Sequence, residues 1–489
     1  MVVGAGPVGL LLALELKLAG VQVIVLERLA APSQVLKAGG IGALGLEALR
    51  RRGMSELIDA AQMRVFGAMG GTAKSDAADA TVDEGRDGPK YCGHFGGLLL
   101  IRGDAQAEPD RAGAPIDQQV IEAMLNERVA SLGIEVSRAC EVAKLTENNN
   151  SVRVSWQSAG REGTIDCSYV VGCDGGRSTV RKLASIAFPG TDPTLTMYQG
   201  LIELDRPDRL PASGFQYRTG GMFMQFAGRL AMVDFSGPPA DRHAPITHQE
   251  LETVLRRITG EDVRIKRFEN AARWTDTTRL VETYRSNRVL VAGDAAHIHS
   301  PFGGQGLSLG LVDAANLGWK LGAVIRGEMS ETRLDTYTAE RRPVAKAVLA
   351  NTLAQTAIMR PDPQSAAIRK IVADLLDFDD ANRFIGGMMS GLAVRYDLGA
   401  ANPMVGSLVG DMPVNGGSLY QLMLDGKGVL LDASDGAAAT QMVCQATTLF
   451  RCVSHTGQSM LIRPDACVAW AEEGGGIDGL EDVLHTWFG

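Results

Sequence analysis

Residues 1–28 read MVVGAGPVGLLLALELKLAGVQVIVLER and predict a strand, a glycine-rich turn, a helix and a second strand. In the GxGxxG turn, Gly4 allows the tight bend, Gly6 lets the backbone approach a pyrophosphate, and Gly9 permits close packing of helix on strand. Free N–H groups at the start of the helix suit the same phosphates. Glu27 ends the second strand, where its carboxylate can accept hydrogen bonds from a ribose diol. The stretch therefore predicts a dinucleotide-binding, Rossmann-like unit.

The composition is that of a globular α/β protein with several domains. Its 489 residues carry 48 Lys+Arg and 57 Asp+Glu, a net charge of −9 that argues against a nucleic-acid partner. The longest apolar runs, Leu10–Leu14 and Leu98–Ile101, are far shorter than the roughly 20 residues that span a bilayer. No leader precedes them and none of the 7 cysteines forms a CxxC pair, so we expect a cytoplasmic protein without membrane attachment. Cys444 and Cys452 are interpreted as small core residues.

Two further segments have the form of a buried strand that runs into an acidic turn. Residues 169–181 read YVVGCDGGRSTVR and place Asp174 after an apolar strand. Residues 288–297 read RVLVAGDAAH and place Asp294 in the same way, and PFGGQG follows at 301–306. With the N-terminal turn, these segments resemble the three fingerprints of flavin-dependent group A aromatic monooxygenases, which have the para-hydroxybenzoate hydroxylase fold.

The resemblance covers essentially the whole chain and extends to one branch of that family. The branch is that of the aromatic polyketide hydroxylases, which includes rifampicin monooxygenases and angucyclinone hydroxylases. The stretches that carry this resemblance are HFGGL (94–98), FPGT (188–191), MMSGLAVRYDLG (388–399), LIRPDACVAW (461–470) and the terminal WFG (487–489).

The resemblance implies an α/β architecture of three domains. The FAD-binding Rossmann-like domain would be discontinuous and built from residues 1–183 and 272–388. A mixed β-sheet substrate domain, residues 184–271, would be inserted between these stretches, in agreement with the strand-like alternation of residues 214–235. The C-terminal domain, residues 389–489, would be thioredoxin-like. It lacks a CxxC motif, which implies a structural or dimer-related role rather than redox chemistry.

The resemblance also implies which residues hold FAD. Asp294 would bind a ribityl hydroxyl and the pyrophosphate side. The turn from Gly303 to Gly306 would direct backbone amides at the flavin pyrimidine edge, where the reduced flavin is anionic. Asp174 would act mainly through structure, in a motif that serves both FAD and the transient NADPH. The expected cofactor-binding residues are Gly4, Gly6, Pro7, Gly9, Glu27, Arg28, Lys37, Gln118, Asp174, Asp294, Gly303, Gly304, Gly306, Leu307 and Ser308.

Two positions depart from the family pattern. Lys37 stands where the family usually has Arg, in a loop near the FAD phosphates, so the charge is kept and the bidentate fork is lost. Ser308 replaces the Asn of the family's GQGLN, which puts any contact of that amide in doubt and keeps the backbone contact. Arg181 has two open interpretations, a phosphate partner or a surface salt bridge.

Several competing interpretations lack a feature that they require. A protein-kinase glycine loop needs HRD and DFG sequences, which are missing. The GxSxG pattern around Ser308 follows a glycine-rich loop, whereas a hydrolase nucleophile directly follows a strand. The pair His297 and His299 has no third ligand at suitable spacing, so both are interpreted as structural and no metal is expected. The run Arg50–Arg52 is interpreted as a solvated helix end. The first strand is short, so either native residues are missing or the sheet tolerates a truncated inner strand.

The expected substrate contacts lie around Phe302, because its neighbours would abut the flavin. Met222, Met224 and Phe226 alternate along a predicted strand and share one of its faces. That face either packs in the core or lines the substrate pocket, and the sequence leaves this choice open. If it lines the pocket, soft methionine side chains suit a large, flat, apolar substrate.

The function that the resemblance implies is NAD(P)H- and O2-dependent hydroxylation of a large polycyclic aromatic substrate of polyketide or antibiotic type. NADPH, with NADH as the alternative, would reduce FAD, and O2 would be captured as a C4a-hydroperoxyflavin. The resemblance also implies a mobile flavin that swings out to meet NADPH, in agreement with a sequence that shows no second dinucleotide fold. No protein nucleophile is expected, and no catalytic base is identified.

Three alternatives stay open. Baeyer–Villiger oxygenation and antibiotic-inactivating hydroxylation share this scaffold. A non-oxygenating flavoprotein, for ligand binding or electron transfer, is the alternative from a different class. In each case the protein would be a monomer or a homodimer.

Overall fold

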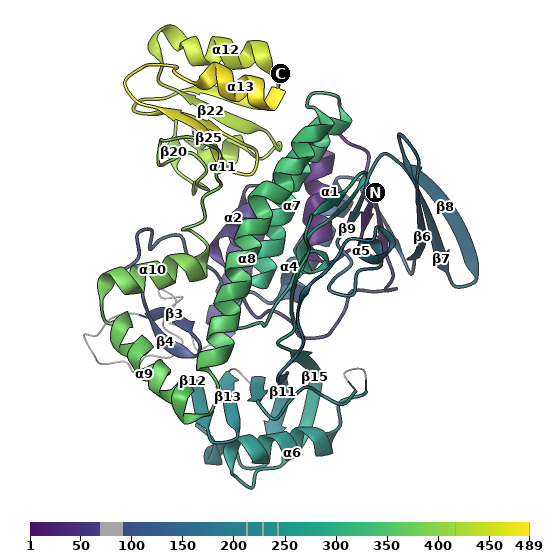
Figure 1. Cartoon of the computed structure of the whole chain (residues 1–489), viewed down its shortest axis with the longest axis vertical. Helices are drawn as coiled ribbons and strands as arrows, with labels where there is room; N and C mark the ends of the chain where they lie inside the picture. The colour runs from purple at the N-terminus through teal and green to yellow at the C-terminus, as the bar shows by residue number, and fades with distance from the viewer. Residues whose placement is uncertain (69–90, 212–213, 227–228, 242–243, 416, 489) are drawn as a thin grey trace.

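The computed structural model describes residues 1–68, 91–211, 214–226, 229–241, 244–415 and 417–488. Figure 1 shows the C-terminal strands and helices at one end of the long axis and the sheet that contains β11–β15, with α6 (His248–Thr259), at the other. The long helices α7 (Gly306–Ile325) and α8 (Asp335–Ile358) run between these ends (Figure 1). Within the described ranges, no helix combines the length and apolarity needed to cross a bilayer.

The sheet below the glycine-rich turn has six strands in the order β17-β18-β9-β1-β2-β5. All pair in parallel except β17, which is antiparallel to β18 at the edge. Its inner strands are buried, as parallel strands usually are: Val2, Val25 and Val171 are at most 1% exposed. The strands are β1 Val2–Val3, β2 Ile24–Glu27, β5 Glu135–Arg138, β9 Val170–Gly172, β17 Arg285–Ser286 and β18 Val289–Val291.

Small residues along α7 let this helix lie directly on α1 (Pro7–Leu18). A Cβ on Gly318 would lie 2.3 Å from the Cβ of Glu15, so any side chain there would clash. A Cβ on Gly322 would lie 2.5 Å from the Cβ of Ala19. Glycines four residues apart share one helix face, so the two helix axes can approach closely over their whole contact.

The inserted sheet has the order β12-β13-β14-β11-β15, with α6 packed on one face. The alternation of residues 214–235 predicted three of its five strands, β12, β13 and β14, and β13 divides its side chains as expected. Phe223 is fully buried towards α6, whereas Met222 packs on the opposite side with Phe302. The strands are β11 Thr196–Leu204, β12 Gly214–Arg218, β13 Gly221–Phe226, β14 Arg229–Asp234 and β15 Ile265–Thr275.

The C-terminal sheet has the order β23-β22-β24-β25, with β22 parallel to β23 and antiparallel to β24. Its βαβ–ββα succession of elements is the one that thioredoxin-like domains have. The domain packs on the end of α7, where the rings of Trp319 and Trp487 lie 5.5 Å apart. Its elements are β20 Pro413–Val414, β21 Gly417–Ser418, α11 Leu419–Leu422, β22 Gly428–Asp432, α12 Ala438–Ala446, β23 Phe450–Ser454, β24 Ser459–Ile462, β25 Val468–Glu472 and α13 Leu480–Phe488.

The remaining elements surround these sheets. The antiparallel sheet β6-β7-β8 projects beside the first sheet (Figure 1), and β10, β16 and β19 form a separate three-stranded sheet. The helices are α2 Ala43–Arg50, α3 Ser55–Ala68, α4 Gln118–Ser131, α5 Thr179–Leu183, α9 Pro363–Leu376 and α10 Asp379–Ser390. The strands are β3 Tyr91–Phe95, β4 Leu98–Arg102, β6 Glu141–Glu147, β7 Val152–Ser158, β8 Arg161–Cys167, β10 Gly190–Thr191, β16 Thr278–Leu280 and β19 His297–Ile298.

Two interpretations from the sequence are wrong. The arginine run is not a solvated helix end, because Arg51 is 4% exposed and Arg52 is fully buried against Glu15. Cys444 is exposed rather than part of the core, and its sulfur lies 3.7 Å from that of Cys452. The error at Arg52 arose because its partner Glu15 comes from a distant element, whereas Cys452 does pack against the core and only Cys444 was misplaced.

Candidate active site

The GxGxxG turn combines two tightly packed glycines with one that faces open space. Gly4 has φ +107°, and a Cβ there would lie 2.4 Å from the carbonyl oxygen of Cys173. A Cβ on Gly9 would lie 2.0 Å from the carbonyl oxygen of Gly4. A Cβ on Gly6 meets no described atom within 4 Å. The turn thus leaves room for a ligand beside Gly6, at the N-terminus of α1, where phosphates are favoured.

Glu27 lies beside this turn and is oriented by two backbone amides. Its Oε2 accepts a hydrogen bond from the amide of Ala5 at 2.7 Å, and its Oε1 accepts one from Leu29 at 2.8 Å. A carboxylate can accept about four hydrogen bonds, so capacity for a diol remains. Arg28, the next residue, is exposed.

Lys37 and Gln118 lie close together, because the loop that contains Lys37 contacts the start of α4. The amide of Gln118 donates to the carbonyl of Ala38 at 2.9 Å, which brings the start of α4 against the Lys37 loop. Both residues line a small pocket with Glu122. Burial raises the pKa of Glu122, and Lys37 opposes this rise.

A further side chain at this place was missed by sequence reasoning. Arg229 on β14 reaches from the inserted sheet and donates to Asp117, the N-cap of α4, at 2.6 Å. A Cβ on Gly39 would lie 2.9 Å from the same guanidinium. Nothing in the sequence around Arg229 signals a partner 112 residues away.

Asp174 caps α5, as a structural role implies. Its Oδ2 accepts hydrogen bonds from the amides of Thr179 at 2.7 Å and Val180 at 3.1 Å. Its Oδ1 is buried and has no partner among the described residues. A buried carboxyl oxygen without a partner calls for a donor, which a hydroxyl of a bound ligand would supply.

Arg181 fits neither of its two interpretations. It is 5% exposed, and its guanidinium donates to the carbonyls of Ala295 and Gly176 at 2.9 and 3.0 Å. Its Cζ lies 3.9 Å from the centre of the Phe188 ring. Arg181 therefore fixes the position of α5 against the turn at 293–297.

Asp294 is exposed at the carboxyl end of β18. The turn below it is fixed by Asp313 on α7, whose Oδ2 accepts a hydrogen bond from the amide of Gly293 at 3.1 Å and contacts His297 Nε2 at 2.7 Å. His297 thus helps to fix this turn, and the described residues contain no cluster of three or more metal-ligating side chains. Sequence reasoning missed Asp313, although an acidic residue inside an otherwise apolar helix was a usable signal.

The loop before α7 presents free backbone donors. Gly303 and Gly304 have φ of +81° and +63°, and a Cβ on Gly304 meets no described atom within 4 Å. No described residue accepts a hydrogen bond from the amides of Gly306, Leu307 or Ser308. These amides and the positive end of the helix dipole suit an anionic group.

The side chain of Ser308 does not face this space. Its Oγ accepts a hydrogen bond from the amide of Gly42 at 2.9 Å, which joins the starts of α7 and α2. Because Ser308 lies inside a helix and is occupied in this way, it is not the nucleophile of a hydrolase.

A chain of amide side chains fixes the loop on its other side. Gln305 accepts a hydrogen bond from Asn351 at 2.6 Å, and Asn351 accepts one from Gln355 at 3.1 Å. Gln355 in turn accepts from the amide of Gly96 at 2.9 Å. The loop that contains Gly304 is therefore held against α8 and the β3–β4 hairpin.

Phe302, directly before this loop, lies in a cluster of apolar side chains. Met222 belongs to the cluster, and Met224 is half-buried opposite Phe215 on the neighbouring strand. The side chain of Phe226 lies outside the described part of the structure. The buried members are Leu195, Met197, Met222, Val233, Phe302 and Met359.

His94 borders this cluster, and sequence reasoning missed it. Its ring lies 4.6 Å from that of Phe215, and its Nδ1 accepts a hydrogen bond from the amide of Gly97 at 3.4 Å. A Cβ on Gly97 would lie 3.4 Å from the sulfur of Met222. Burial lowers the pKa of His94 to about 4, so its imidazole is neutral near pH 7.

Comparison with known proteins gives matches over almost the whole chain. The family model "FAD binding domain" matches residues 1–352, and "Aromatic-ring hydroxylase, C-terminal" matches residues 402–489. A 12-dehydrotetracycline 5-monooxygenase/anhydrotetracycline 6-monooxygenase of Streptomyces rimosus is 36% identical over 524 residues, which cover 100% of this chain and 98% of the relative. A rifampicin monooxygenase of Streptomyces venezuelae is 34% identical over 496 residues, with coverage of 100% and 98%.

Solved structures agree with these relatives. The OxyS anhydrotetracycline hydroxylase from Streptomyces rimosus has a TM-score of 0.86 and 34% identity, and the match covers 100% of this chain and 98% of that one. The expected fold class is thereby confirmed.

Proposed function

The chain belongs to the family of FAD-binding aromatic-ring hydroxylases, and from this premise we propose that it hydroxylates a large polycyclic aromatic compound of polyketide or antibiotic type. It is an FAD-dependent monooxygenase. The relatives named for tetracycline and rifampicin chemistry support the substrate class. The observation that carries the proposal is the position of Phe302, which is buried in a methionine-rich apolar cluster and directly precedes the loop that leads to the free amides at the start of α7.

The residues that would hold FAD follow the chain from the turn to α7. Gly6 would face the pyrophosphate, and Glu27 would accept hydrogen bonds from the adenosine ribose. Lys37 and Gln118 would lie near the phosphates and the flavin, and Asp294 would bind the ribityl side. The open space at Gly6 and Gly304, the free amides of α7 and the unpartnered oxygen of Asp174 all fit such a group.

When bound and reduced, FAD supplies the activation of O2 for transfer of one oxygen atom to the ring. The chain contributes orientation, exclusion of water and fixed dipoles. The amides of Gly306 and Leu307 would stabilise negative charge at the flavin edge. They would need no rearrangement to do so, because Gln305 already fixes the loop before them. The cluster around Phe302 would keep water from the reacting atoms.

The protein surface that contacts the substrate would be apolar and adaptable. Met197, Met222 and Met359 supply flexible, polarisable side chains that fit several ring shapes. We assign no nucleophile, since the chemistry needs none. We further propose NADPH as the reductant, with NADH as the alternative.

The proposal is tested by incubating the purified protein with NADPH, ¹⁸O2 and a panel of polycyclic phenols. The expected result is a yellow protein that forms product carrying one ¹⁸O atom. Asp294→Ala should purify with little or no flavin. NADPH consumption that yields only hydrogen peroxide with every phenol would support the non-oxygenating alternative. An oxygen inserted between two carbon atoms would instead indicate Baeyer–Villiger chemistry.

A further inference from the structure

The turn that carries Asp294 rests on one buried carboxylate. Asp313 is fully buried and contacts both ends of the segment 293–297, at the amide of Gly293 and at Nε2 of His297. Burial by itself would raise the pKa of Asp313, but Arg341 and His297 hold it below its usual value. The carboxylate is therefore ionised and accepts from several donors at once. Its position determines where the backbone around Asp294 lies.

Arg341 on α8 determines the position of Asp313 in turn. Its Nε donates to Asp313 Oδ1 at 2.7 Å, and its Nη2 donates to the carbonyl of Leu309 at 3.1 Å. Its Nη1 donates to the hydroxyl of Tyr396 at 3.0 Å. The guanidinium is 1% exposed, so all three contacts form out of water, where a lost partner is expensive.

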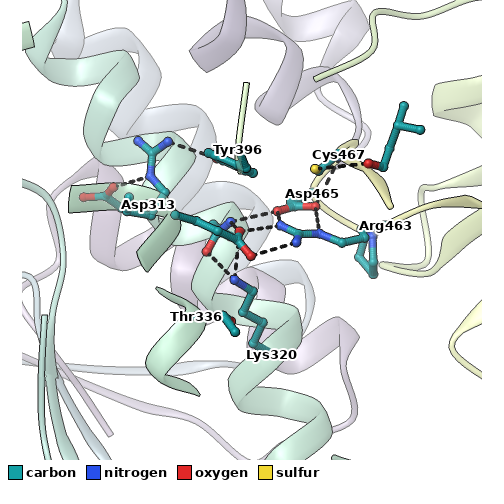
Figure 2. A network of polar contacts seen from close by, with 12 residues as sticks. Asp313, Lys320, Thr336, Tyr396, Arg463, Asp465 and Cys467 are labelled. Carbon is teal, nitrogen blue, oxygen red and sulfur yellow. Dashed lines mark hydrogen bonds and ion pairs between the residues drawn. The ribbon is translucent and has the colours of Figure 1, made fainter. Parts of the chain in front are cut away.

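Tyr396 comes from the C-terminal region and is 2% exposed. Figure 2 shows it between the guanidinium that pairs with Asp313 and the charge cluster of Arg463 and Asp465. Its amide donates to the carbonyl of Gly406 at 2.8 Å, and the amide of Gly406 donates to Val468 on β25 at 2.8 Å. The backbone of Tyr396 is thus connected to the C-terminal sheet.

We propose that Tyr396 is a positioning residue through which the C-terminal domain holds the cofactor turn. The contacts run from β25 through Tyr396, Arg341 and Asp313 to the amide of Gly293 and the ring of His297. This inference rests on the proposed role of Asp294 in binding FAD. It assigns the C-terminal domain a part in cofactor binding, although that domain contributes none of the residues expected to touch FAD.

The physical argument concerns one hydroxyl. Without it, Nη1 of Arg341 has lost an acceptor in a dry interior, and the guanidinium must move towards another oxygen. Movement of the guanidinium changes the donor geometry at Asp313 and loosens the turn that it supports. The ring of Tyr396 would remain in Tyr396→Phe, so packing is preserved and only this contact is removed.

The chain offers a matched control in Tyr420. This residue is 4% exposed, and its hydroxyl donates to the carbonyl of Val409 at 3.1 Å, inside the C-terminal region. Tyr396→Phe and Tyr420→Phe therefore each remove one buried hydroxyl. Both should lower the melting temperature of the apoprotein, whereas only the first loses a contact to Arg341.

The experiment measures FAD binding to each apoprotein, together with the visible circular dichroism of the bound flavin. Tyr396→Phe should bind FAD about fivefold more weakly and change the dichroism, and Tyr420→Phe should match the wild type in both. Asp313→Asn should weaken binding further, and adding Tyr396→Phe to it should cause no additional loss. If Asp313→Asn does not fold, the comparison of the two tyrosine variants decides alone.

Equal FAD affinity and equal dichroism in the two tyrosine variants would overturn the inference, as would additive losses in the double variant. Failure of the proposed function looks different. In that case the wild type binds no FAD, or Asp294→Ala binds it as tightly as the wild type. If Asp294→Ala loses FAD while the tyrosine variants agree, the proposed function stands and the role of Tyr396 is rejected.

Discussion

Arg52 and Glu15 form a bidentate ion pair inside the protein, with both N–O distances at 2.8 Å. Arg52 is fully buried and Glu15 is 3% exposed. The same guanidinium donates to the carbonyls of Met423 at 3.0 Å and Pro464 at 3.0 Å. One side chain thus joins α1 of the first domain to two loops of the C-terminal region.

Removal of this guanidinium should be strongly destabilising. Arg52→Ala leaves the buried carboxylate of Glu15 without its cation, which typically costs about 3–5 kcal/mol of unfolding free energy. Arg50→Ala is the control, because Arg50 and its partner Asp59 are partly exposed and such pairs contribute about 0–1 kcal/mol. Urea unfolding of both variants measures the difference. Similar midpoints for the two would contradict the burial of Arg52.

Glu27→Ala should weaken FAD binding by at least about 100-fold, because two hydrogen bonds to a charged acceptor contribute roughly 1.5–3 kcal/mol each, about 3–6 kcal/mol together. Glu27→Gln should lose less, since its amide oxygen still accepts one bond. The measurement is FAD titration of the apoprotein, followed by flavin fluorescence. Wild-type affinity in Glu27→Ala would show that the ribose assignment is wrong.

Two neighbours on β13 separate the substrate face from the core face. Met222→Ala should raise KM for the aromatic substrate and increase the peroxide released per NADPH, because its side chain packs with Phe302. Phe223→Ala should cost about 3–5 kcal/mol of stability and leave KM unchanged, because Phe223 packs towards α6. Steady-state kinetics and unfolding curves of both variants test this. If KM rose in Phe223→Ala and not in Met222→Ala, the substrate pocket would lie on the face of β13 that carries Phe223.

His94 should make stability depend on pH in acid. Its pKa falls from 6.5 to about 4 through burial, so the unfolded chain binds its proton first as the pH drops. The stability from keeping His94 neutral is complete above about pH 6.5 and is lost as the pH falls towards 4, up to about 3 kcal/mol. Unfolding of wild type and His94→Gln at pH 7 and 4.5 measures the contribution. Parallel losses in both proteins would contradict it.

Hydrogen peroxide should join Cys444 and Cys452. Exposed Cys444 meets the oxidant first and is oxidised to a sulfenic acid while peroxide is reduced to water. The thiol of Cys452, 3.7 Å away, then displaces a second water and forms the disulfide. Intact mass spectrometry after alkylation should show a loss of ~2 Da and two unalkylated cysteines. Cys444→Ser is the control, and oxidation that leaves Cys452 alkylatable in the wild type would refute the pairing.

The parts of the fold that the sequence predicted are those governed by short-range rules. Gly4, Gly6 and Gly9 divide into packed and open positions as the GxGxxG pattern requires. Three strands of the inserted sheet, β12, β13 and β14, follow from period-two alternation between residues 214 and 235. In both cases the cause lies within a few residues of its effect, so one sequence suffices.

The parts that the sequence did not predict depend on contacts between distant segments. Arg52 is interpretable only with Glu15, 37 residues before it, and Arg229 only with Asp117. Arg181 was interpreted as a phosphate partner or a surface salt bridge because the carbonyls that bind it belong to the backbone, which carries no residue-specific signal. The role of each of these charged side chains is set by contacts with segments that are distant in the sequence.

The order of strands in the first sheet has a consequence for synthesis on the ribosome. β1 lies between β2 and β9, and β18 pairs with the other edge of β9. The sheet is therefore incomplete until residue 291 has been synthesised. The helix that packs on α1 ends only at Ile325. α4 (Gln118–Ser131) also packs on α1, but the face of α1 that α7 covers remains without that cover while about 300 residues emerge, at roughly 5–20 residues per second. The apolar residues on that face of α1 are therefore exposed during the first tens of seconds of synthesis.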